Sequence, residues 1–322
     1  MSKDPLDADW ELSRLYQELG LPAENAPLDP AQPDAGRSGP QPDAGRGRLR
    51  YGQARRAPGR RSLARTISNL LIVVGVVLLV AAGGVWGFTQ WRYHESEVEN
   101  ERLAAYAEVF ENPSDAPQVD WEGLREINDD AVGWLYVPGT TINYAVYQGE
   151  DNEQYLHHSA TGNWVVSGQL FMDYQGSAPG MVDEQTIIYG HHLLNGTMFE
   201  QIAAMDDQDK FNEIDTVWYV TDQGAHELVP LLMYYSRADN QDVRRFNFGN
   251  IDEYHAYLGS LLDKSVTSRP DAARIIQGTR HVLSLVTCNY YREYYDEDGT
   301  NGRSILVCVP KVEVDAALAS QT

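Results

Sequence analysis

The sequence predicts a mainly β domain that is preceded by one membrane-spanning helix. Residues 70–88 form a run of 19 without a charged side chain. Beyond residue 130, short stretches rich in β-branched and aromatic residues are separated by Gly, Pro, Asp and Asn, which is the pattern of β-strands. Eight such stretches follow one another, and eight short strands are typical of a barrel or a sandwich.

The apolar run is long enough to cross a bilayer. As a helix it would span about 28 Å, close to the hydrocarbon thickness. Trp86, Trp91 and Tyr93 cluster at its far end, where aromatic rings prefer the membrane interface. A cleaved signal peptide is the alternative, but the run is longer than a signal core and 69 residues precede it. We expect a transmembrane helix over residues 67–91.

Charge sets the expected orientation. Eight arginines and no acid lie between residues 46 and 65, so the positive-inside rule places this side in the cytoplasm. Residues 1–66 contain 11 Lys and Arg and 9 Asp and Glu; the whole chain carries −22, so the remainder carries −24. An exterior this acidic argues against a nucleic-acid partner and against a domain lying flat on anionic lipid.

The cytoplasmic segment is expected to be disordered. Residues 32–37 (QPDAGR) recur as residues 41–46, in a stretch rich in Pro, Gly, Asp and Arg with few apolar side chains to bury. Residues 10–19 alone have helical spacing there, which suits either a docking helix or a surface helix.

The exterior part is expected to begin with juxtamembrane helices over residues 92–128, at 94–110 and 121–127, followed by a barrel over residues 129–322. Alternating patterns predict strands at 134–137, 142–147, 169–172, 186–189, 216–221, 227–235, 281–287 and 304–309. Helical spacing predicts a short helix at 198–205 and a longer one at 251–262. The longer helix is an insertion between the sixth and seventh strands.

Cys288 ends the seventh strand and is one of two cysteines. A thiolate is a good nucleophile, and nearby positive charge favours it. A buried small hydrophobic residue is the alternative, and so is a disulfide with Cys308. In an unbroken last strand Arg303, Ile305 and Val307 share one face and Cys308 lies on the other. If Arg303 faces the thiol, Cys308 therefore does not.

Two cationic or titratable residues are placed to serve this thiol. His191 follows the fourth strand and Gly190, and a glycine allows a sharp turn that presents the imidazole at a strand end; His192 is the competing residue. Arg303 opens the last strand. Its guanidinium does not deprotonate, but it can stabilise an oxyanion. Arg292 is the alternative for that role.

Metal binding is not expected. The neighbouring histidines at 157 and 158 lack coordination spacing, and the acidic residues 296–301 lack the twelfth-position glutamate of a calcium loop. We interpret residues 296–301 as a solvated hairpin tip.

The chain resembles the sortases, class B in particular, over residues 108–312. Six stretches carry the resemblance in order: residues 127–134 (INDDAVGW), 142–152 (INY, YQG and DN), 186–192 (TIIYGHH), 195–199 (NGTMF), 285–288 (LVTC) and 302–303 (GR). The resemblance implies an eight-stranded β-barrel with N-terminal helices and a helix between strands 6 and 7, which agrees with the independent strand count.

The resemblance also implies cysteine transpeptidation without a cofactor. Cys288 would attack a backbone carbonyl in the C-terminal sorting signal of a secreted protein, His191 would act as general acid and base, and Arg303 would steady the oxyanion. The thioester would be resolved by an amine of a peptidoglycan stem or by a pilin lysine.

The resemblance further implies that Asn152 and Leu156 line the substrate groove, and that Val286 and Asn289, which flank Cys288, border it. A membrane-anchored cysteine hydrolase and an inactive barrel used as a binding scaffold are the alternatives to a transpeptidase.

Overall fold

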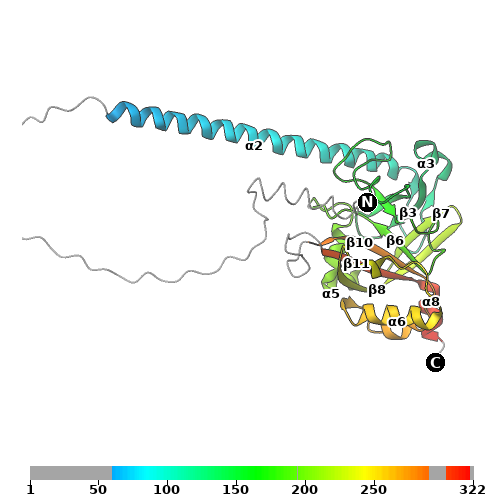
Figure 1. The fold of residues 1–322 in the computed structure, drawn as a ribbon. Coiled ribbons are helices and arrows are strands. Elements are labelled where there is room, and N and C mark those ends of the chain that lie inside the picture. The colour runs from blue at the N-terminus through cyan, green and yellow to red at the C-terminus, as the bar shows by residue number, and fades with distance from the viewer. Residues whose placement is uncertain (1–59, 194, 290–301, 320–322) are drawn as a thin grey trace, which may run out of the picture. The chain divides into compact units, whose positions relative to one another are not determined.

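The computed structural model of the protein describes residues 60–319 except residues 194 and 290–301 (Figure 1). The expected cytoplasmic segment up to residue 59, Arg292 and the acidic residues 296–301 lie outside the described residues. The described chain divides into two units, one ending at Thr89 and one beginning at Gln90.

Helix α2 (Arg60–Ala104) is continuous over 45 residues. Its segment Thr66–Phe88 has a mean hydropathy of 2.6, and among the described residues it is the one helix long and apolar enough to cross a membrane. The helix expected to reach residue 110 ends at Ala104 instead. The chain turns there because Ala107–Glu108 (β1) pairs with Gln118–Val119 (β2) in a small antiparallel ladder.

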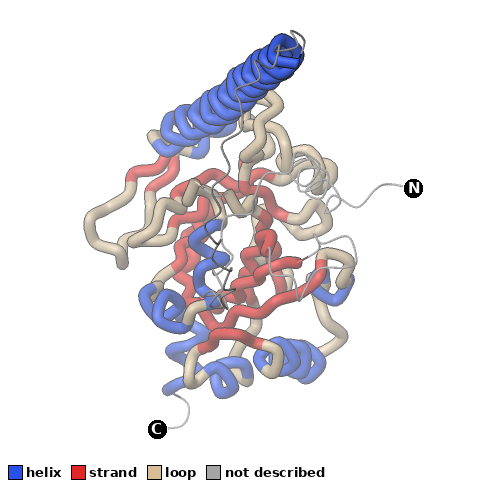
Figure 2. Tube along the Cα trace, turned by 90° about the vertical axis from the view of Figure 1, so that its left-hand side faces the viewer, coloured by secondary structure: helices blue, strands red, loops and turns tan. Residues whose placement is uncertain are grey.

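All eight predicted strands are present. They are β3 (Ala131–Tyr136), β4 (Asn143–Tyr147), β5 (Leu170–Met172), β6 (Gln185–Tyr189), β7 (Val217–Thr221), β8 (Gly224–Arg237), β10 (Val282–Asn289) and β11 (Gly302–Pro310). They are neighbours in the order β11, β10, β6, β5, β4, β3, β7, β8, and β8 also pairs with β11. The sheet therefore closes into a barrel rather than splitting into a sandwich, with helices around the central strands (Figure 2).

The inserted helix between the sixth and seventh barrel strands is confirmed as α6 (Ile251–Leu262), which begins where the side chain of Asn250 accepts a hydrogen bond from the amide of Glu253. The helix α3 (Trp121–Ile127) is also where its pattern placed it. The helix expected over 198–205 is split into α4 (Glu200–Ala203) and the 3₁₀ turn η2 (Ala204–Asp206). The remaining elements are α5 (Gln208–Glu213), η3 (Gln241–Arg244), β9 (Ser265–Ser268), α7 (Ala272–Ile276) and α8 (Lys311–Ala319). In Figure 1, α6 and α8 lie beside β8, which both contact.

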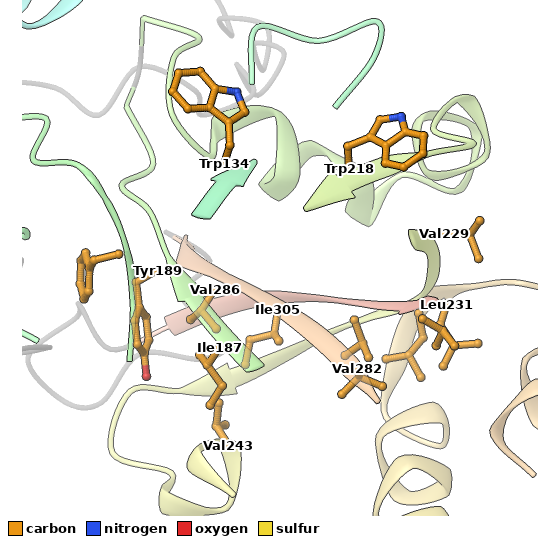
Figure 3. Close-up of a cluster of buried hydrophobic side chains, with 14 of the residues drawn as sticks. Trp134, Ile187, Tyr189, Trp218, Val229, Leu231, Val243, Val282, Val286 and Ile305 are labelled. Carbon is orange, nitrogen blue, oxygen red and sulfur yellow. The ribbon is translucent and has the colours of Figure 1, made fainter. Parts of the chain in front are cut away.

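Apolar side chains form two layers, one on each face of the barrel wall. The inner layer takes side chains from all eight strands, including Leu285, Leu306 and Cys308. The outer layer, packed beneath the surrounding helices, includes Val286 and Ile305 (Figure 3). Because side chains alternate along a strand, Cys288 and Arg303 point to the outer face and Cys308 points into the barrel.

Candidate active site

Three of the predicted site residues lie in one row across neighbouring strands. Cys288 is the direct cross-strand partner of Arg303 in the antiparallel β10–β11 ladder. Strand β6 runs parallel to β10 with Tyr189 opposite Val286, so extending this register by two residues brings His191 level with Cys288. Adjacent strands are about 4.8 Å apart. The side chains of His191, Cys288 and Arg303 therefore share the outer face as neighbours.

Gly190 is needed for packing rather than for a turn, which corrects the sequence-based interpretation. It is not among the glycines with positive φ. A Cβ at this position would lie 2.5 Å from Leu170 Cδ2 and 2.7 Å from Phe199 Cδ2. The absence of a side chain lets β6 run straight on toward His191 above the packed inner layer.

A hydrogen bond from one ring nitrogen orients the His191 imidazole. Its Nε2 lies 2.7 Å from the carbonyl oxygen of Leu156. A carbonyl can only accept, so Nε2 carries a proton and donates it. Nδ1 is then the ring nitrogen at which a proton could be exchanged with a reacting group, as a general acid and base requires.

His192 takes a different part. Its Nδ1 donates to the main-chain carbonyl of Cys288 at 3.0 Å. The amide of Gly190 also donates to the carbonyl of Val286 at 3.1 Å. These two bonds continue the β6–β10 pairing past the end of β6, so they fix the backbone of the candidate nucleophile against the strand that carries the histidine.

The candidate nucleophile and the arginine are largely buried, with Cys288 8% and Arg303 3% exposed. Arg303 Nη1 donates to the carbonyl of Gly302 at 2.9 Å. Because water is largely excluded there, a fixed guanidinium strongly stabilises a developing negative charge. Cys308, by contrast, is expected to be unreactive, because complete burial in the barrel raises the pKa of its thiol far above the usual range.

Val286 and Asn289 lie close to Cys288 on β10, but their side chains point to different faces of the barrel wall. Val286 is 3% exposed and sits in the outer layer between its register partners Tyr189 and Ile305, one step below the row (Figure 3). Asn289 belongs by alternation to the inner face, and its side chain fills the space where a Cβ of Gly302 would be. Val286 therefore lies on the same face as the Cys288 thiol, two residues before it, whereas the Asn289 side chain points to the other face.

The other two predicted groove residues lie in the segment after β4. Leu156 is half-buried and contributes its carbonyl to His191. Asn152 is 4% exposed, and its side chain donates to Asp173 and accepts from the amide of Tyr174, both at 3.0 Å. Both ends of the Asn152 amide are thus used within the protein.

Several residues near the site were not among the predicted site residues; His157 was considered in the sequence only as part of a histidine pair for metal binding. The ring centroid of His157 lies 5.8 Å from that of His191, and the Trp164 ring lies 6.1 Å from His157. Ser236 of β8 is the register partner of Arg303 and continues the row. Only the closure of the barrel brings these residues together. Over residues 60–319, with 194 and 290–301 excepted, no three His, Cys, Asp or Glu side chains are grouped as metal ligands.

The comparisons with known proteins agree on one family. A sortase-domain model matches residues 135–311. Sortase B of Listeria monocytogenes is 26% identical over 232 residues, covering 69% of this chain and 92% of that protein. Sortase B of Staphylococcus aureus is 30% identical over 168 residues, covering 52% and 67%.

Solved structures match the barrel as well. Clostridium perfringens sortase B superposes with a TM-score of 0.51 at 30% identity, covering 58% of this chain and 97% of that one. A Staphylococcus aureus sortase B–substrate complex gives a TM-score of 0.51 at 28% identity, covering 59% and 83%. Since the family model spans more than half of the chain and the barrel carries Cys288, His191 and Arg303 in one row, the chain belongs to the sortase family, in its class B.

Proposed function

We propose that the protein is a membrane-anchored transpeptidase that works through a thioester on Cys288. The observation that carries the proposal is the row of His191, Cys288 and Arg303 on the outer face of the barrel. A nucleophile, an acid–base group and a fixed cation on neighbouring strand positions are what amide exchange needs.

The reaction has two balanced acyl transfers. The Cys288 sulfur bonds to the carbonyl carbon of the peptide, and the C–N bond breaks as His191 gives its proton to the leaving amine. Arg303 stabilises the oxyanion in between. In the second half an incoming amine attacks the thioester, His191 takes up its proton, and the thiolate leaves. No cofactor enters either step, since each bond broken is replaced by one formed.

The membrane arrangement belongs to the proposal. The helical segment Thr66–Phe88 would cross the bilayer, with arginine-rich residues 1–66 inside and the barrel outside. The chain would then divide into a cytoplasmic segment (1–66), a transmembrane helix (67–91), a juxtamembrane segment (92–128) and a catalytic barrel (129–322). Its substrates would be secreted proteins with a C-terminal sorting signal, and its acceptors a peptidoglycan stem amine or a pilin lysine.

The test is to trap the acyl-enzyme. The full chain in detergent micelles is incubated with a pentapeptide library, and intact-mass spectrometry follows the adduct on Cys288. Cys288→Ala should lose the adduct, whereas Cys308→Ala, the matched change at the other cysteine, should keep it.

Adding an amine then separates the candidate activities. Triglycine or lysine amide should give a ligated peptide. Release of the free acid alone, with amine present, would indicate a hydrolase, and a wild-type chain that forms no adduct with any library member would indicate an inactive scaffold.

A further inference from the structure

Asp173 is a fully buried carboxylate beside the site that the proposed reaction does not use. It follows β5 and is 0% exposed. Arg244 of η3 binds it through two nitrogens, Nε to Oδ2 at 2.8 Å and Nη2 to Oδ1 at 3.0 Å. Burial of an unpaired carboxylate is costly, and a two-nitrogen arginine pair is the geometry that offsets it well.

The same carboxylate binds two segments that lead to His191. The hydroxyl of Tyr189 donates to Asp173 Oδ2 at 2.9 Å, and Tyr189 lies two residues before His191 on the same face of β6. The side chain of Asn152 donates to the same oxygen at 3.0 Å. Burial, and then the charge of Asp173, raise the pKa of Tyr189 well above its usual value, so its phenol stays protonated and keeps donating.

The segment that starts at Asn152 ends at the carbonyl bound by His191. Asp151 accepts from the amides of Glu153 and Gln154, both at 2.9 Å, and the amide of Leu156 donates to the carbonyl of Glu153 at 3.2 Å. This turn is short and internally bonded, so a shift of Asn152 moves the Leu156 carbonyl with it.

We propose that Asp173 is a positioning residue for His191, holding through Asn152 and Tyr189 both the carbonyl that orients the imidazole and the strand that carries it. The inference rests on the proposed function of His191 as acid and base. It gives Asn152 a role inside the protein instead of a contact with substrate.

The test uses Asn152→Ala and Tyr189→Phe, each of which removes one bond to Asp173 without changing a charge. In the full chain in micelles, the acylation rate at saturating peptide should fall, by up to about 100-fold for a displacement near 1 Å, and KM should stay unchanged. Tyr235→Phe is the matched control. It removes a phenol bond of 2.7 Å to a different carboxylate, that of Asp206, and should behave as wild type.

A second readout is independent of how much protein is folded. The hydrogen bond from Nε2 to the Leu156 carbonyl is stronger when the imidazole carries its second proton, so loosening this carbonyl disfavours the protonated ring. Since acylation needs His191 protonated, the high-pH limb of the rate profile should move to lower pH in both variants. All variants retain His157, His192, Cys288 and Arg303, the other titratable or charged groups described around the ring.

Two results would overturn the inference. One is a higher KM for Asn152→Ala with the profile at its wild-type position, which would make Asn152 a substrate contact. The other is a limb that stays in place in both variants. Failure of the proposed function looks different, because the wild-type chain itself would then form no acyl-enzyme.

Discussion

Replacing Gly190 with alanine tests whether this glycine is present for packing. Its new Cβ would approach Leu170 Cδ2 to 2.5 Å and Phe199 Cδ2 to 2.7 Å, about 1 Å inside ordinary contact. Leu170 and Phe199 are both fully buried, so neither can move into solvent. Overpacking of this kind costs about 1–3 kcal/mol of unfolding free energy. For a domain of this size that lowers Tm by about 2–4 °C per kcal/mol.

The displacement should also reach the site. His191 is the next residue, so a backbone shift near 1 Å would slow acylation by up to about 100-fold. Thermal unfolding by circular dichroism and the acylation rate of the full chain in micelles give the two measurements. Gly259→Ala in α6 is the control; nothing lies within 4 Å of its Cβ, and it should stabilise the helix by about 0.5–1 kcal/mol.

A second substitution separates packing from backbone conformation. Leu170→Ala removes the nearest clashing atom, so Gly190→Ala should destabilise a Leu170→Ala background by less than it destabilises the wild type. Equal losses in the two backgrounds would refute the packing argument. So would a Gly190→Ala protein with wild-type Tm and rate.

Three shorter predictions concern the cysteines, His192 and the pH dependence of stability. Iodoacetamide at neutral pH should label Cys288 and spare Cys308 in the folded chain, because burial raises the pKa of the Cys308 thiol; peptide mapping would show both labelled after denaturation. His192→Asn should keep most of the acylation rate and His192→Leu should lose about tenfold, since only Asn replaces the donor to the Cys288 carbonyl; equal rates would contradict this. The hydrogen bond to Glu313 raises the pKa of His281 despite opposing burial. The folded pKa then exceeds the unfolded one, so this stabilisation is present below about pH 6.5 and is lost as pH rises through the folded pKa. Glu313→Gln should therefore lower Tm more at pH 5.5 than at pH 8, and the same drop at both values would count against it.

Much of the barrel was predictable because strand signals are local. The alternation of β-branched and polar residues with Gly, Pro and Asp between them identified all eight strands, and helical spacing gave α3 and α6 their observed bounds. The elements that were missed include β9 with four residues, α7 with five, α5 with six and α8 with nine. Segments of that length carry too few periods to stand out, and they form because β8 and the neighbouring helices offer them a surface.

The site residues were chosen from the alternation of side chains along a strand and from the resemblance to sortases. Alternation predicted that Cys308 and Arg303 lie on different faces of the last strand. The barrel wall agrees, because Cys308 lies in the inner cluster whereas Ile305 and Val307 lie in the outer one. The prediction that Gly190 allows a sharp turn was wrong. The glycine is needed because Leu170 and Phe199, which are distant in sequence, pack against its Cα in the folded barrel.

By itself, the sequence determined the apolar span, the strand count, the inserted helix and the reactive residue types, because these depend on composition and short periodicity. Only the tertiary structure decided which side chains meet. Register set Cys288 beside Arg303, the parallel pairing of β6 and β10 brought His191 level with them, and a loop more than thirty residues earlier supplied the Leu156 carbonyl. The physical reason is that pairing register and long-range hydrogen bonds are settled by closing the barrel, where each strand is fixed by two neighbours at once.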